Sequence, residues 1–212
     1  MATVVIDPGH GGSTTVGNSS PNNAHGPVGT LEKNVTLDLA LRVLRAFAGS
    51  GHAVLLTRDT DVNLGLAERA AVARTHTAAA FVSLHFNGDA SPAVQGTEVW
   101  THSVAIEDSR LLAASVLQQV VAVTGYHNRG AKSKGLGVLS LASHDLGTAA
   151  CLLEVSFLTD PHDETRLLQE SYKNALANAI RTGITDFINR SSSLPPPANP
   201  IPSGNPDGTG DA

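Results

Sequence analysis

Histidine and glutamate side chains stand at the ends of the predicted elements of this chain. His10 follows the first apolar run, His85 ends the third and Glu154 lies in the last, while Glu32 opens the first long helical pattern. Where such runs form a parallel sheet, their carboxyl ends meet at one edge, and sites form beyond that edge. We therefore expect these four side chains to converge.

This set of side chains suits a catalytic zinc ion. Two histidines and one carboxylate are a common ligand set that leaves the fourth position to water, which zinc makes far more acidic. A second carboxylate then serves as general base. The count fits His10, Glu32 and His85 as ligands and Glu154 as base, but the residues alone do not decide which glutamate is the ligand.

Structural roles are the alternative reading. A strand-end histidine is more often hydrogen bonded than metal bound, and the DPGHGG segment at 7–12 is also a turn signal. The coincidence of four suitable groups at four element ends favours a site. Asp7, Ser83 and Asn87 flank the candidate ligands and are candidates for orienting them, with turn or strand-end roles as the alternative.

Short apolar runs alternate with helical patterns. The runs predict strands at Thr3–Asp7, Ala53–Thr57, Ala79–His85, Gly96–Thr101, Val138–Leu141 and Ala149–Val155. Apolar residues at i, i+3, i+4 spacing predict helices around Leu37–Phe47, Leu66–Thr75, Leu112–Val123 and Leu176–Ile188, with another beginning at Pro161. This alternation predicts an α/β domain with a mostly parallel sheet and helices on both faces.

Composition excludes several classes of protein. The 212 residues carry a net charge of −5, which argues against a nucleic-acid-binding protein. No apolar run is long enough to span a membrane, so we expect a protein that is not integral to the membrane. The single cysteine, Cys151, rules out an intrachain disulfide framework.

The last segment differs from the rest of the chain. Residues 191–212 hold six of the eleven prolines (Pro195, Pro196, Pro197, Pro200, Pro202 and Pro206). Such a composition buries too little apolar surface to offset the entropy of ordering. We therefore expect one domain at 1–190 and a Pro-rich disordered tail at 191–212.

Ordered motifs along residues 3–189 resemble a known family. They include VVIDPGHGG at 4–12, LEKNVTLDLALRV at 31–43, FVSLHFNG at 81–88, QGTEVW at 95–100 and LLEVSFLTDPHDE at 152–164. The chain resembles the zinc-dependent N-acetylmuramoyl-L-alanine amidases of type 3. Its Ala-rich, Lys-poor composition suggests a mycobacterial or other actinobacterial member.

The resemblance implies a twisted, mostly parallel six-stranded sheet flanked by helices. It implies one zinc ion held by His10, Glu32 and His85, with Glu154 as the catalytic carboxylate. The implied reaction is hydrolysis of the peptidoglycan amide that joins N-acetylmuramic acid to L-alanine of the stem peptide. The implied setting is exported, in the periplasm, the cell envelope or secreted, where autolysins and cell-division hydrolases act, and we expect a monomer with its signal peptide absent from this sequence.

Three segments either differ from the family pattern or have no role that the family pattern assigns. The loop 13–30 is longer than usual and carries His25, which we expect to be a solvated loop residue rather than a ligand. The short stretch at 102–108 leaves little room for a helix that plugs the zinc site, so an open groove is expected. The polar stretch at 127–134 is interpreted as a solvated loop, with contact to a substrate carboxylate as the less favoured reading.

Two other functions remain as alternatives. A zinc peptidase that cuts within the stem peptide uses similar ligands. A non-catalytic cell-wall-binding module would keep the fold, but a dead homologue is expected to lose Glu32 or Glu154, and both are present.

Overall fold

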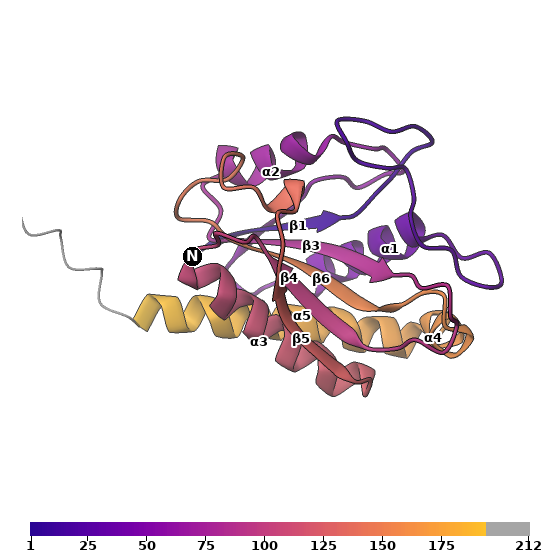
Figure 1. Ribbon diagram of the computed structural model, residues 1–212. Helices are drawn as coiled ribbons and strands as arrows, with labels where there is room; N and C mark the ends of the chain where they lie inside the picture. The colour runs from indigo at the N-terminus through magenta and orange to yellow at the C-terminus, as the bar shows by residue number, and fades with distance from the viewer. Residues whose placement is uncertain (194–212) are drawn as a thin grey trace, which may run out of the picture.

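The computed structural model describes residues 1–193 (Figure 1). The last helix runs to Ser193, past the domain boundary predicted at residue 190. The rest of the Pro-rich tail predicted at 191–212 lies outside the described residues. Within residues 1–193, no helix is both long and apolar enough to cross a bilayer.

The described chain alternates strands and helices, as the sequence predicts. The strands are β1 (Thr3–Pro8), β2 (Ala53–Leu56), β3 (Ala80–Asn87), β4 (Thr97–Thr101), β5 (Asn128–Ser133) and β6 (Ala149–Phe157). The helices are α1 (Glu32–Ala46), α2 (Leu66–Thr75), α3 (Glu107–Thr124), α4 (Pro161–Leu167) and α5 (Glu170–Ser193), with a 3₁₀ turn η1 at Gly137–Leu139. Asp160 caps α4 by accepting a hydrogen bond from the backbone N–H of His162.

The strands form one six-stranded sheet in the order β2-β1-β3-β6-β4-β5. Neighbouring strands are parallel except for β4 and β6, which run antiparallel. The predicted mostly parallel α/β sheet is therefore confirmed. Because β1, β3 and β6 are adjacent and parallel, their carboxyl ends lie together at one edge.

Helices cover both faces of the sheet (Figure 1). Alternate residues of the central strands, such as Val4 and Val82, pack with α1, α3 and α5 in the larger core. The residues between them, such as Val5 and Phe81, pack with α2 and η1 in a smaller core. Strands buried on both faces are apolar at nearly every position, which made them recognisable in the sequence.

One predicted strand is wrong, and one strand was not predicted. Val138–Leu141 is not a strand: Val138 and Leu139 belong to η1, where burial against the smaller core explains their apolar side chains. The fifth strand is instead β5, in the stretch interpreted as a loop. Its sequence, NRGAKS, is polar because β5 is the edge strand and is largely exposed.

Candidate metal centre and active site

Three of the predicted side chains come together beyond the strand ends. His10 lies in the loop after β1, Glu32 is the first residue of α1, and His85 lies near the end of β3. One ligand atom from each lies within 4.8 Å of the others. His10 Nε2 is 3.2 Å and His85 Nδ1 is 3.0 Å from the same oxygen, Glu32 Oε1.

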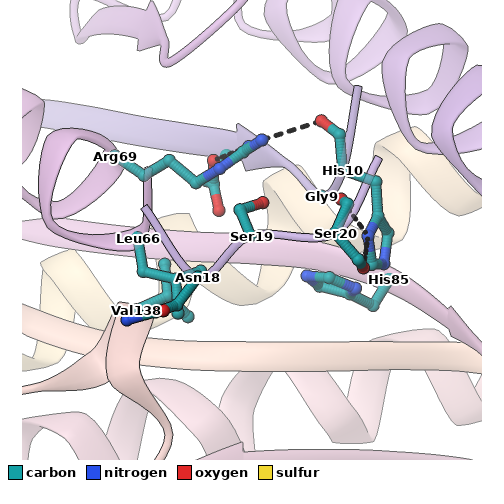
Figure 2. A pocket seen from close by; sticks show the side chains of 10 residues that line it. Gly9, His10, Asn18, Ser19, Ser20, Leu66, Arg69, His85 and Val138 are labelled. Atoms are coloured by element: carbon teal, nitrogen blue, oxygen red, sulfur yellow. Dashed lines mark hydrogen bonds and ion pairs between the residues drawn. The ribbon is translucent and has the colours of Figure 1, made fainter. Parts of the chain in front are cut away.

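Ser20 holds one side of the His10 ring. His10 Nδ1 lies 3.0 Å from the backbone oxygen of Ser20 and 3.1 Å from Ser20 Oγ (Figure 2). On the other side of the ring, Nε2 lies 3.2 Å from Glu32 Oε1. Nε2 is buried and makes no hydrogen bond among the described residues. A cation bound at this cluster would give Nε2 a partner.

Glu32 is oriented by main-chain groups. Its Oε2 accepts from the N–H of Ala24 at 2.8 Å, and its Oε1 accepts from the N–H of Phe86 at 3.1 Å. Burial by itself raises the pKa of Glu32, but its close contacts with His10 and His85 outweigh burial and hold that pKa below its usual range. Glu32 is therefore an ionised carboxylate that could serve as a ligand.

His85 packs against a glycine. A Cβ atom at Gly9 would lie 2.3 Å from His85 Cε1 and 2.5 Å from its Nε2. Only glycine leaves room for the imidazole here. Gly9, the first glycine of the DPGHGG segment, thus shapes the site.

The long loop at 13–30 also contributes to the site. Ser20 holds His10 through its backbone oxygen and its hydroxyl, and Ala24 holds Glu32 through its backbone N–H. His25 is exposed and lies outside the cluster, as expected. The segment 102–106 between β4 and α3 contains no helix, also as expected.

Two buried arginines support the backbone that carries His10. Arg69 donates to the oxygens of Pro8 and His10, each at 2.8 Å, and Arg58 donates to those of Pro8 at 3.0 Å and Gly9 at 2.9 Å. His10 has φ of 61°, a left-handed conformation that is uncommon for histidine. Figure 2 shows the Arg69 guanidinium reaching the His10 carbonyl. Sequence reasoning missed both arginines.

Asp7 acts through Arg69. Its Oδ1 lies 2.9 Å from Arg69 Nη1, and its Oδ2 accepts from Ser83 Oγ at 2.6 Å. Burial opposes ionisation of Asp7, but Arg69, Ser83 and Thr57 together lower its pKa. Asp7 and Ser83, predicted to flank the ligands, therefore bear on His10 indirectly.

Glu154 lies beside this cluster. Its backbone is in register with His85 across β3 and β6, and its side chain lines the same hollow as both histidines. The side chain is partly exposed, but Oε2 is buried and makes no hydrogen bond among the described residues. Burial, together with the negative charges of Glu32 and Glu98, raises the pKa of Glu154 well above its ordinary value.

The hollow extends from the cluster over β4 and β6. It has a volume of about 360 Å³. It is lined by His10, Ser20, Asn23, His85, Asn87, Glu98, Trp100, Lys134, Leu136, Leu152 and Glu154. Asn87, the third predicted flanking residue, donates to Glu98 Oε1 at 3.2 Å. Glu98 is a buried carboxylate that sequence reasoning did not single out.

The donor set fits a zinc ion. Two imidazole nitrogens and one ionised carboxylate are typical zinc ligands, whereas Mg²⁺ and Ca²⁺ prefer oxygen ligands throughout. The unpartnered Nε2 of His10 and the close approach of Gly9 to His85 agree with a site built around a bound ion. Glu154 then remains as the carboxylate that is free to exchange protons.

Comparison with known sequences identifies a family pattern. The pattern described as N-acetylmuramoyl-L-alanine amidase matches residues 4–186. A similar curated protein is the N-acetylmuramoyl-L-alanine amidase LytC of Bacillus subtilis, 32% identical over 190 residues. That alignment covers 87% of this chain but 35% of LytC, so the chain spans about a third of that relative.

Solved structures share the fold. The catalytic domain of CwlV, an N-acetylmuramoyl-L-alanine amidase from Bacillus (Paenibacillus) polymyxa, is 31% identical with a TM-score of 0.78 and covers 89% of this chain and 99% of that domain. The N-acetylmuramoyl-L-alanine amidase AmiC2 of Nostoc punctiforme is 33% identical, with a TM-score of 0.77 and coverage of 89% and 98%.

Proposed function

Because the chain belongs to the N-acetylmuramoyl-L-alanine amidase family, we propose that it hydrolyses the amide between N-acetylmuramic acid and L-alanine of the peptidoglycan stem peptide. The observation that carries this proposal is the buried His10–Glu32–His85 cluster with an unpartnered Glu154 in the same hollow. Amide hydrolysis needs an activated water and a group that protonates the leaving nitrogen, and this arrangement provides for both.

His10, Glu32 and His85 would hold the metal, which we propose to be one zinc ion. A bound zinc ion lowers the pKa of water and polarises carbonyl groups. The contacts of His10 with Ser20, the main-chain bonds to Glu32 and the packing of His85 on Gly9 orient these three side chains.

Glu154 is the proposed general base and acid. Its raised pKa makes its carboxylate a better proton acceptor than an exposed glutamate. In the proposed reaction, Glu154 takes one proton from the attacking water as the water oxygen bonds to the amide carbon. It then gives that proton to the L-alanine nitrogen as the C–N bond breaks, so the carboxylate is regenerated.

The substrate implies the setting. Peptidoglycan lies outside the cytoplasmic membrane, so we propose an exported enzyme of the cell envelope that acts as a monomer. The proposed processes in which it acts are autolysis or cell division. A single cysteine is compatible with this location, because a core of this size does not need disulfides.

Digestion of purified peptidoglycan tests the reaction. We expect free stem peptides and intact glycan strands by chromatography and mass spectrometry. Shortened stem peptides would instead identify a peptidase, and zinc-loaded protein that releases nothing but binds the glycan would identify a wall-binding module.

Replacement of one carboxylate tests the role of Glu154. Glu154→Gln should lower kcat by about 10²–10⁴-fold, because the amide cannot take the water proton. Zinc content should stay that of the wild type, because Glu154 is not a ligand. Glu107→Gln, at an exposed position of α3, is the matched control. A fully active Glu154→Gln would overturn this assignment.

A further inference from the structure

The hollow beside Glu154 has a second wall that the hydrolytic chemistry does not use. This wall comes from β4, β5 and the residues that follow β5. The strand register places Glu98 opposite Glu154, and it places Trp100 between Leu152 of β6 and Lys132 of β5. Side chains at alternate positions of neighbouring strands share one face, so this wall continues the face that carries Glu154.

Positive charge exceeds negative charge on this wall. Glu98 is 3% exposed, and its Oε2 lies 2.8 Å from Arg129 Nε and 2.6 Å from Lys132 Nζ. Burial raises the pKa of Glu98, but Lys132 and Arg129 outweigh it and keep this carboxyl ionised. One carboxylate therefore faces two cations, which leaves an excess of positive charge.

Lys134 adds a third cation. It lies two residues beyond Lys132, is exposed and lines the hollow that contains Glu154. Within residues 1–193 it has no acidic side chain within 4.0 Å. This local excess of positive charge stands against a net charge of −5 for the whole chain.

Lys132 is held in place, and its ammonium keeps N–H donors that the bond to Glu98 does not use. Its ammonium lies 5.2 Å from the centre of the Trp100 ring, and the Trp100 indole N–H donates to Glu98 Oε1 at 3.0 Å. An ammonium has three donors, and the bond to Glu98 uses one of them. The wall thus combines fixed cations with an apolar platform made by Trp100, Leu136 and Leu152.

We propose that Lys134, supported by Lys132, forms a subsite for a carboxylate of the acidic peptide that leaves in the reaction. The inference rests on the proposed function and adds the part of the substrate that this wall recognises. An acidic peptide fits because its carboxylates complement the excess cations, while its short apolar side chains lie against Trp100 and Leu136. The sugar then lies on the other side of the scissile bond, away from the lysines.

Two substrates that differ only in charge test the subsite. Both are N-acetylmuramoyl-L-alanyl dipeptides: one ends in glutamate, and the other in the diamide of glutamate. An exposed charge-assisted hydrogen bond contributes about 1 kcal/mol, which is about fivefold in an equilibrium constant. We expect the wild type to have a kcat/KM about fivefold higher for the acid, mainly through KM.

The variant Lys134→Gln should bring this ratio to about one. It keeps a polar, slightly shorter side chain but removes its charge. The preference of the wild type should also shrink between 0.05 and 0.5 M salt, because salt screens exposed charges. Lys173→Gln is the matched control, since Lys173 pairs with Asp38 and Glu170 on another part of the surface and should leave the ratio unchanged.

The possible failures are distinct. If neither substrate is cleaved by the zinc-loaded wild type, the proposed function fails. If both are cleaved equally well, or if Lys134→Gln keeps the preference of the wild type for the acid, the amidase activity stands and this subsite is overturned.

Discussion

The side chains of the proposed metal ligands are held mainly by main-chain atoms. His10 depends on the oxygen of Ser20, and Glu32 on the N–H groups of Ala24 and Phe86. The backbone of His10 is itself fixed by Arg69, whose donors reach the oxygens of Pro8 and His10. The position of His10 therefore depends on the buried guanidinium of Arg69, a planar group with five N–H donors.

Arg69→Lys should weaken zinc binding about 10–100-fold, as losses of groups that orient metal ligands typically do. A lysine keeps the charge beside Asp7 but cannot hold the backbone oxygens of Pro8 and His10 together. Competition with a chromophoric chelator measures the affinity, and circular dichroism checks that the variant is folded.

Arg110→Lys provides the comparison, because Arg110 is exposed and pairs only with Glu107 in the salt bridges of the described chain. It should bind zinc as the wild type does. A folded Arg69→Lys protein with unchanged zinc affinity would show that Arg69 supports the fold but does not position His10.

Strand-end reasoning predicted that the candidate site residues would converge, but their roles were harder to separate. The alternation of elements predicted that His10, His85 and Glu154 would converge, because parallel strands direct their ends to one edge. The residues alone could not choose between Glu32 and Glu154. The structure distinguishes them by contacts: Glu32 lies against both imidazoles, whereas Glu154 Oε2 has no hydrogen-bond partner among the described residues.

Elements that depend on distant partners were missed. β5 has no apolar alternation, since it pairs along one edge only and its charged residues bind Glu98 of β4. Val138 and Leu139 are apolar because η1 is buried, and a buried turn and a buried strand look alike in sequence. The contact of Arg69 with Asp7, 62 residues away in sequence, leaves no local signal.

A buried carboxyl in the short helix α4 makes the stability of the folded state depend on pH. Burial raises the pKa of Asp163 to about 6, although the Ser156 hydroxyl donates to this carboxyl and opposes the rise. In the unfolded chain this carboxyl has the ordinary aspartate pKa of 3.8. Between about pH 4 and 6 the folded state binds more protons than the unfolded state, so this group makes stability fall as pH rises through that window.

Asp163→Asn should remove that dependence. At pH 7 the variant should be more stable than the wild type by about 3 kcal/mol, and the difference should fall below about 1 kcal/mol near pH 4. Urea unfolding at both pH values measures it. The exposed Asp59→Asn should follow the wild type, and an Asp163→Asn protein less stable at pH 7 would refute the assignment of a buried ionisation.

At the scale of the whole molecule, the metal centre joins three parts of the fold. His10 follows β1, Glu32 begins α1 and His85 belongs to β3. A ligand that binds only the folded state stabilises it, by about 2.7 kcal/mol at a free concentration of one hundred times Kd. For a domain of this size we expect zinc to raise Tm by about 5–10 °C.

Scanning calorimetry with a chelator, followed by zinc add-back, measures this shift. Mg²⁺ should not restore the Tm, because nitrogen donors suit it poorly. His85→Ala should have the same Tm with and without zinc. A wild-type Tm that is indifferent to zinc would contradict a metal centre at this cluster.

The loop at 13–30 grips the site through the carbonyl of Ser20 and the N–H of Ala24. Every amino acid provides that carbonyl, and all but proline provide that N–H. Apart from the Ser20 hydroxyl, which also lies 3.1 Å from His10 Nδ1, this support depends on the path of the loop and not on its side chains. Two related proteins can keep these main-chain contacts while the sequences of their loops diverge. A sequence alignment would then miss a contact that both structures share.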